Sequence, residues 1–502
     1  MNSFDEPAPS QQSAAAILGP ADPTTFFDEQ RRNRRATWRL AVGCVFAIVV
    51  VGLPISLVLA PLLYGVTLIV INTINLLVPM PAIIDILRGV GNLAFAILDY
   101  LAGEKGATIS PLSLTLSLVA WFAPGTLAMI MIWCGIYFLF RDSGIGGIVL
   151  SVGARPPRQG DLEEFQLGNL VTEMSLAAGI TPPRLLLLDG DVVNAAAIGR
   201  SRDDAVLIVS RRLVDEYDRD ETQGIIGHLI GSISNGDLDI AFWMTSVLLS
   251  FSLLVAILKA PFSVNGRTTF LRLIRLGLRG WRGGLDGAAD KELLNRMING
   301  NFAIEDIDDK RMPPLLVPFI LASLAVQWTL FVLVPGLLQP FLALLWRKRR
   351  YLADATAVQL TRNPEGLARA LLKPSWQTIP GGQGVAHLFL YGPVGSESLG
   401  DFFMWKGVGF HPTPKRRLLR LHALGAHVDL AKLNSAAPAQ PHPVLFFAIK
   451  ILLGLLMLVA AAACVAAIGL FVLVSMFIMG MFLMAIHAVF MAVGAVKGWI
   501  FG

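Results

Sequence analysis

The chain has 502 residues, of which 54% are hydrophobic and only 15% are charged. Soluble domains carry about a quarter of charged residues, so this composition argues against a soluble protein and indicates a membrane protein. The net charge of +5 is modest. It fits the positive flanks of membrane helices, and no nucleic-acid partner is expected. The three cysteines lie in apolar runs and have neither metal-ligand nor disulfide spacing.

The N-terminal part of the chain is predicted to be a basic arm followed by membrane helices. Residues 1–37 are expected to be disordered, and they end in a cluster of arginines. Residues 38–140 form the predicted N-terminal transmembrane region. It begins with a long uncharged run, which Pro54 and Pro61 are expected to break, and a second span lies near 113–140. The positive-inside rule places the arginine cluster in the cytoplasm, and two crossings return the chain there.

Residues 219–239, RDETQGIIGHLIGSISNGDLD, follow the outline of a zincin active-site helix. In H-E-x-x-H, one helix face presents both histidines to a zinc ion, and the glutamate polarises the zinc-bound water. Here His228 is present, whereas Leu229 stands at the glutamate position and Ser232 at that of the second histidine. A catalytic zinc needs three protein ligands and an open position. This helix offers one good ligand.

The motifs that follow resemble those of the HtpX-type and CAAX-prenyl-protease-type membrane zinc metallopeptidases. In that family a later helix carries E-x-x-A-D, in which the glutamate is the third zinc ligand and the aspartate orients a ligand. The matching run here is R-Y-L-A-D, with Arg350 at the ligand position and Asp354 at the aspartate position. The resemblance covers roughly residues 140–425. Its other landmarks stand in the family's order: Asn194, Asp237 of the NGD run, His387 and His411.

The resemblance implies an α+β fold, namely a polytopic α-helical membrane protein with a zincin-like metallopeptidase domain in which a small β-sheet packs on helices. The two parts of that domain are predicted at 141–239 and 347–442. Short β-type runs occur at 184–189 and 205–210. The active-site helix is expected at 219–235.

Two further segments are expected to associate with the membrane. Residues 240–346 are predicted to be a membrane-associated hairpin with a basic amphipathic loop, and residues 443–502 a C-terminal transmembrane hairpin. The number of full crossings stays open, because a single crossing before the basic loop would place that loop outside. The loop carries arginines at helical spacing that are expected to face lipid headgroups: Arg272, Arg275, Arg279 and Arg282.

The altered motif positions favour a structural role for the site. His228 is expected to be a hydrogen-bonded histidine rather than a zinc ligand, and a dyad of His228 with Ser232 lacks an orienting residue. Arg350 lies one turn before Asp354, so its guanidinium is expected to fill the metal position and pair with that carboxylate. The remaining landmarks are expected to be structural: Asp237, Asn194, His387 and His411.

These observations predict a metallopeptidase homologue that has lost its zinc site. Its expected role is that of a non-catalytic pseudopeptidase that binds a partner, a membrane substrate or lipid, without a cofactor, although the family implies zinc. Two alternatives stay open: an active membrane zinc endopeptidase with unorthodox ligands, and a lipid- or solute-handling membrane protein. Besides the lipid bilayer, the expected partner is another membrane protein or protease. The expected location is the bacterial inner membrane, with the peptidase-like domain cytoplasmic.

Overall fold

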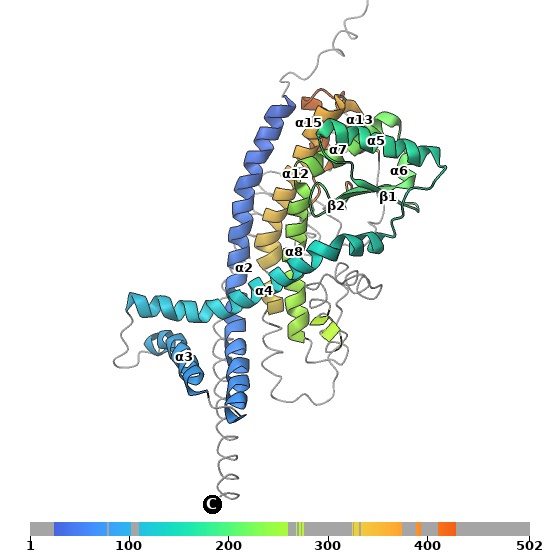
Figure 1. Cartoon of the computed structure of the whole chain (residues 1–502). Helices are drawn as coiled ribbons and strands as arrows, with labels where there is room; N and C mark the ends of the chain where they lie inside the picture. Colours follow the sequence, from blue (N-terminus) through green and yellow to red (C-terminus); the bar gives the residue numbers. More distant parts are fainter. Residues whose placement is uncertain are drawn as a thin grey trace, which may run out of the picture. The chain divides into compact units, whose positions relative to one another are not determined.

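The chain forms two compact units in a computed structural model (Figure 1). The first unit comprises Met1–Val42, Ile145–Thr245 and Phe341–Gln440. The second comprises Gly43–Gly144, Ser246–Pro340 and Pro441–Gly502. Within these ranges the structure describes residues 25–77, 80–101, 110–259, 333–373, 388–392 and 410–427, together with a few positions between 268 and 330.

The N-terminal region consists of helices α2 (Phe26–Leu77), α3 (Pro81–Leu101) and α4 (Pro111–Val152). For residues 26–37 the expectation of disorder was wrong, because α2 begins at Phe26, and residues 1–24 lie outside the described residues. The Thr25 side chain caps this helix by accepting a hydrogen bond from the backbone N–H of Asp28 at 3.2 Å. The expected break at two prolines was also wrong: α2 continues through both, as membrane helices tolerate.

Two stretches of the described helices are long and apolar enough to cross a membrane, by length and composition: Phe26–Ser56 of α2 and Pro111–Phe138 of α4. The predicted span near 113–140 thus corresponds to the first part of α4. The predicted C-terminal hairpin at 443–502 lies outside the described residues. In the basic loop, Arg272 and Arg275 are exposed, and Arg279 and Arg282 lie outside the described residues.

A three-stranded sheet lies in the first unit, in the order β1-β3-β2. Strand β1 (Arg184–Leu188) pairs in parallel with β3 (Ala205–Ser210), and β2 (Ala195–Gly199) pairs with β3 in antiparallel fashion. The predictions of β1 and β3 are confirmed. Strand β2 was not predicted, because its sequence AAAIG contains mainly residues that are rare in strands.

Both outer edges of this sheet carry a single-residue bridge. At β1, Arg155 and Leu187 exchange two backbone hydrogen bonds of 2.8 and 2.7 Å. At β2, Phe389 bridges Ala196, and the Leu390 N–H donates to the Ala195 carbonyl at 2.7 Å. Each edge of the sheet is therefore bridged at one residue by a segment outside the strands.

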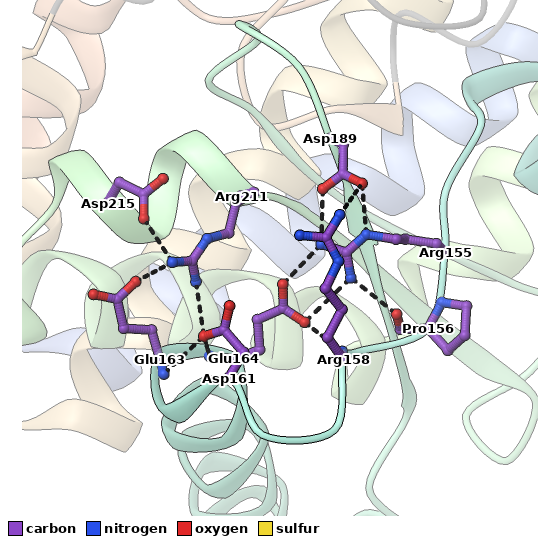
Figure 2. A network of polar contacts seen from close by, with 9 residues as sticks. All are labelled: Arg155, Pro156, Arg158, Asp161, Glu163, Glu164, Asp189, Arg211 and Asp215. Carbon is purple, nitrogen blue, oxygen red and sulfur yellow. Dashed lines mark hydrogen bonds and ion pairs between the residues drawn. The ribbon is translucent and has the colours of Figure 1, made fainter.

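An ion-pair network fixes the first of these bridges (Figure 2). The Arg155 guanidinium lies 2.6 Å from Asp189 and 2.7 Å from the buried Glu164, near the start of α5 (Leu162–Ala178). A neighbouring guanidinium, that of Arg211 at the start of α6 (Arg211–Glu216), lies 3.3 Å from the α5 N-cap Asp161. The chain that enters the domain is thus tied to β1 and to α5.

Five further helices have both ends within the described residues: α7 (Arg219–Ser234), α8 (Asp237–Lys259), α12 (Gln339–Thr361), α13 (Pro364–Leu372) and α15 (Pro414–Ala423). A π-helical turn at Val334–Leu338 precedes α12. Helix α7, predicted at 219–235, is confirmed. Its start is fixed by a capping box in which Asp218 and Glu221 each accept from the other's backbone N–H, at 2.8 and 2.9 Å.

One face of α7 is made of glycines. A Cβ built at Gly224 would lie 2.5 Å from the backbone nitrogen of Leu367 on α13, and one at Gly231 would lie 3.0 Å from Thr356 on α12. These helices therefore approach α7 almost backbone to backbone. The opposite face packs its isoleucines and leucine into the core of the domain, against α5 and the strands. The side chains between these two faces are buried deeply and form the site.

Candidate functional site

His228, Arg350 and Asp354 come together at the contact of α7 with α12. His228 Nδ1 lies 2.8 Å from Asp354 Oδ1, and His228 Nε2 lies 3.3 Å from Arg350 Nη1. All three residues are at most 2% exposed. The imidazole is therefore held between a carboxylate on one side and a guanidinium on the other.

Two backbone carbonyls and an aromatic ring hold the Arg350 guanidinium, in addition to the imidazole. Its Nη2 donates to the backbone carbonyls of Leu388 at 3.1 Å and Phe389 at 2.6 Å. The indole ring of Trp346 lies 5.1 Å from the guanidinium carbon, within cation–π distance. Burial, together with the nearby Arg417, lowers the pKa of Arg350 to about 10. The side chain still carries its positive charge at neutral pH.

The ion-pair partner of Asp354 lies on a third helix. Arg417 on α15 contacts it with two nitrogens, Nε to Oδ2 at 2.9 Å and Nη2 to Oδ1 at 2.6 Å. The expected pairing of Asp354 with Arg350 therefore needs correction. The two residues lie one turn apart on α12, but the two-point ion pair of Asp354 is with Arg417. Burial alone would raise the pKa of Asp354, but Arg417 and His228 hold it well below the ordinary value.

The protonation state of His228 follows from its surroundings. Burial lowers the pKa of His228 to about 4, with Arg417 and Arg350 adding to the effect and Asp354 opposing it. The imidazole is therefore neutral at physiological pH. Asp354 Oδ1 accepts a hydrogen bond from the Nδ1–H of His228, which assigns the proton to that nitrogen and leaves the Nε2 lone pair facing Arg350. That lone pair is the one with which an imidazole in this orientation would bind a metal.

Ser232 and Asp237 form a second buried group at the C-terminal end of α7. The Ser232 hydroxyl donates to Asp237 Oδ2 at 2.6 Å, and Arg349 on α12 forms a salt bridge with the same carboxylate. Arg349 also donates to the Asn235 carbonyl at 2.5 Å. Burial raises the pKa of Asp237, whereas Arg349 and Ser232 act against this rise. The Ser232 hydroxyl is thus committed to a structural hydrogen bond, one turn from His228.

Leu229 belongs to the apolar core. Its side chain is fully buried and clusters with residues of α5 and the strands, among them Leu167 and Leu207. A carboxylate at this position would be surrounded by hydrocarbon.

Asn194 and His411 contact the segment that bridges strand β2. The Asn194 side chain donates to the Tyr391 carbonyl at 2.8 Å and accepts from the Tyr391 N–H at 3.1 Å. The ring of His411 packs so closely on Gly392 that a Cβ there would lie 1.8 Å from it. His387, the remaining landmark, lies outside the described residues.

Within the described part of the chain, no group of three histidine, cysteine, aspartate or glutamate side chains is placed to hold a metal ion. The residues that the motif resemblance aligns with the zinc ligands, His228, Ser232 and Arg350, offer an imidazole, a hydroxyl and a guanidinium. An imidazole is a good zinc ligand, a neutral hydroxyl is a poor one, and a guanidinium has no lone pair to offer. As described, these side chains do not fit a zinc ion.

Two arginines of the site, Arg349 and Arg417, were not singled out in the sequence. Both lie in basic runs, RKRR and PKRR, in which buried and exposed arginines look alike. A signal was nevertheless present in α15, where Arg417 lies one turn before the buried Leu421. Its neighbour Arg416 points to solvent.

The sequence model of Peptidase family M48 matches residues 161–445. A protein named "Protease HtpX homolog" from Thermoanaerobacter pseudethanolicus is 28% identical over 325 residues, which cover 60% of this chain and 92% of the relative. One of the same name from Caldanaerobacter subterraneus subsp. tengcongensis is 30% identical over 278 residues, which cover 55% of this chain and 76% of that relative. A third, from Dictyoglomus turgidum, is 28% identical over 323 residues, which cover 62% of this chain and 86% of that relative. No solved structure matches the chain.

The chain therefore belongs to Peptidase family M48, which confirms the resemblance inferred from its motifs. It is a membrane-type member, similar to proteins named as homologues of the protease HtpX, with a mostly helical fold, a small mixed sheet and two candidate membrane helices. The family implies zinc.

Proposed function

We propose that this protein is a non-catalytic member of its family, in which the guanidinium of Arg350 stands in place of the zinc ion. The observation that carries the proposal is the distance of 3.3 Å between Arg350 Nη1 and His228 Nε2. One nitrogen lone pair cannot accept a hydrogen bond and bind a metal ion at the same time. The buried positive charge would also repel a dication.

The surroundings of Arg350 support a permanent replacement rather than a movable gate. Its Nη2 is held by two backbone carbonyls, and Trp346 lies beside the guanidinium. An arginine side chain keeps its proton in proteins, so a change of pH would not free the position for a metal.

The two other altered positions support the loss of peptide hydrolysis. Leu229 has no group that can take a proton from water, and it packs in the apolar core. The Ser232 hydroxyl donates to Asp237, which in turn pairs with Arg349. Neither side chain supplies the base or the ligand that a zinc peptidase needs.

The proposed role is the binding of a partner, a membrane substrate or lipid by a scaffold that no longer cleaves. The similarity to proteins named for the protease HtpX supports a membrane setting, and we place the protein in the bacterial inner membrane. The arginine cluster in the first turns of α2 supports a cytoplasmic position for the peptidase-like domain. The competing function is that of an active zinc endopeptidase with unorthodox ligands. The experiment must distinguish it from the non-catalytic binding role.

Elemental analysis of the purified full-length protein tests the proposal directly. The expected result is zinc far below one ion per chain, unchanged by His228→Ala, together with no cleavage of an unfolded membrane-protein substrate. A His422→Ala variant is the matched control, because this histidine is not part of the zincin-like motif and its Nδ1 lies 2.9 Å from the Ala426 carbonyl.

About one zinc ion per chain that disappears in His228→Ala but remains in His422→Ala would overturn the proposal in favour of the endopeptidase. A membrane protein that co-purifies stably with the metal-free protein would support the binding role.

A further inference from the structure

The first turns of α2 present two chemically opposite faces. The inner face packs on the peptidase-like domain through polar side chains. Asn33 is fully buried and donates to Glu29 at 2.9 Å, and Glu29 forms a salt bridge with Arg420 on α15. Gln30 donates to Thr356 at 3.2 Å and to Gln359 at 2.7 Å, both on α12. These contacts fix the rotation of α2 about its own axis.

The fixed rotation turns a row of arginines outward. Arg31, Arg35 and Arg39 are exposed and follow one another at steps of four, so they lie on one face of the helix. Arg32, on the border of this face, is paired with Glu29 at 2.5 Å. Asp28 is the acidic residue on the outward face, and its carboxylate accepts a hydrogen bond from Thr25 at 2.7 Å. The outward face is therefore positively charged.

The same face of α2 becomes apolar one turn further along. Trp38 is 75% exposed, and it is followed on this face by exposed valines at positions 42, 45 and 49. The steps of four, three and four keep these residues in line with Arg31 and Arg35. Arg31 and Arg35 precede Trp38, Arg39 lies directly beside it, and the valines follow. This is the order of a bilayer surface: headgroups, interface and hydrocarbon.

We propose that Arg31, Arg35 and Arg39 form a binding site for the headgroups of anionic phospholipids, with Trp38 at the boundary of the acyl chains. Clusters of arginines next to a membrane helix attract an anionic leaflet, and guanidinium groups match phosphate oxygens in two-point contacts. The Trp38 ring, apolar in body and polar at its N–H, suits the interface. This site is independent of the zinc position and of the loss of catalysis.

The apolar stripe distinguishes a lipid from other anionic ligands. An acidic peptide or free phosphate would be bound by the arginines alone and would gain nothing from Trp38 and the valines. A phospholipid engages both, because its phosphate and its acyl chains are joined in one molecule. The contacts of the inner face hold α2 in one orientation, so the outward site is preformed. Lipid binding therefore requires no reorientation of the helix.

Native mass spectrometry of the full-length protein in detergent tests the site by counting bound phosphatidylglycerol during a titration, with phosphatidylcholine as the neutral comparison. The expected result is preferential binding of phosphatidylglycerol that weakens as salt is added. Replacing the three arginines by glutamine should weaken that binding about a hundredfold, since each contributes about fivefold. A triple lysine variant should retain most of it, because the charge remains.

The matched control removes three exposed arginines elsewhere on the same domain: Arg184→Gln, Arg202→Gln and Arg416→Gln. This control should bind phosphatidylglycerol like the parent, and a thermal melt of each variant verifies that the fold is intact. Equal loss in the control and the glutamine variant would overturn the proposal, as would equal binding of phosphatidylcholine. Displacement of the lipid by inorganic phosphate would show a free-anion site and would also contradict it.

Discussion

Asp354 on α12 lies 2.8 Å from His228 on α7, measured from Oδ1 to Nδ1, and both side chains are buried. The contact joins the two helices that carry the residues resembling the zincin motif. It orients the imidazole so that its second nitrogen faces Arg350. A histidine held by an aspartate thus faces a guanidinium, and the following predictions test what each group contributes.

Arg417→Ala is predicted to destabilise the protein by about 3–5 kcal/mol, because it leaves the buried Asp354 carboxylate without its two-point partner. Adding Asp354→Asn should restore part of the loss. Thermal unfolding in detergent measures both effects. The exposed neighbour gives the control, since Arg416→Ala should change stability by less than about 0.5 kcal/mol. Equal effects of the two alanine variants would show that the ion pair does not hold α15 on α12.

Arg350→Ala is predicted to destabilise as well, but for a different reason. It removes the donor to the carbonyls of Leu388 and Phe389, and a buried polar group that loses its partner costs about 1–3 kcal/mol. Adding Asp354→Asn should not restore stability, because that carboxylate keeps Arg417. Comparison of the single and double variants in a thermal melt decides the point. Full rescue by Asp354→Asn would mean that Arg350 is the main counter-charge of Asp354 after all.

Reintroducing two ligands is predicted to create a zinc site. The pair Ser232→His and Arg350→Glu supplies, with His228, the three ligands of the family pattern. Elemental analysis should find about one zinc ion per chain, and Ser232→His with Arg350→Gln should bind far less. Adding Leu229→Glu should lower the melting temperature, because it places a carboxylate in the apolar core. If the pair binds no zinc, the assignment of these positions to the family motif is wrong.

The network around Arg155 predicts a dependence of stability on pH. The hydrogen-bonded guanidinium of Arg155 lowers the pKa of Glu164 below its ordinary value of 4.5, against the effect of burial. A carboxyl group whose pKa is lower in the folded state stabilises that state at pH values above its pKa in the unfolded chain. This stability is lost as the pH falls below that pKa. As the pH falls from about 5 through 4.5 and below, the parent should therefore lose more stability than Glu164→Gln. Glu173→Gln, an exposed change on the same helix, should follow the parent.

The N-terminal end of α2 and the peptidase-like domain are predicted to lie on the same, cytoplasmic side of the membrane. Arg34 donates to Asn235 at 3.4 Å, so the two segments share one compact unit. Single cysteines introduced at Arg34 and at Arg212, in a chain without its own cysteines, should react with an impermeant reagent only after permeabilisation. Labelling of either position in intact cells would contradict this orientation.

The part of the fold that the sequence predicted best is the part governed by local patterns. The apolar runs of β1 and β3 and the start of α7 follow from propensity and capping. Strand β2 escaped prediction because its alanines owe their extended form to pairing with β3. The pair of Arg417 with Asp354 escaped because it joins residues 63 positions apart. The choice between Arg350 and Arg417 as partner of that carboxylate depends on helix packing, which one sequence does not contain.

The bridges at the two edges of the sheet bear on how copies of this protein meet in the plane of a membrane. Confinement to two dimensions makes encounters between copies frequent, and an unpaired strand edge invites a neighbouring copy to add its own strand. Here Arg155 covers the edge of β1 and Phe389 that of β2. A copy approaching either strand meets an edge on which one residue is already bridged. The bridges therefore shorten the stretch of free backbone on which the sheet of another copy could add a strand.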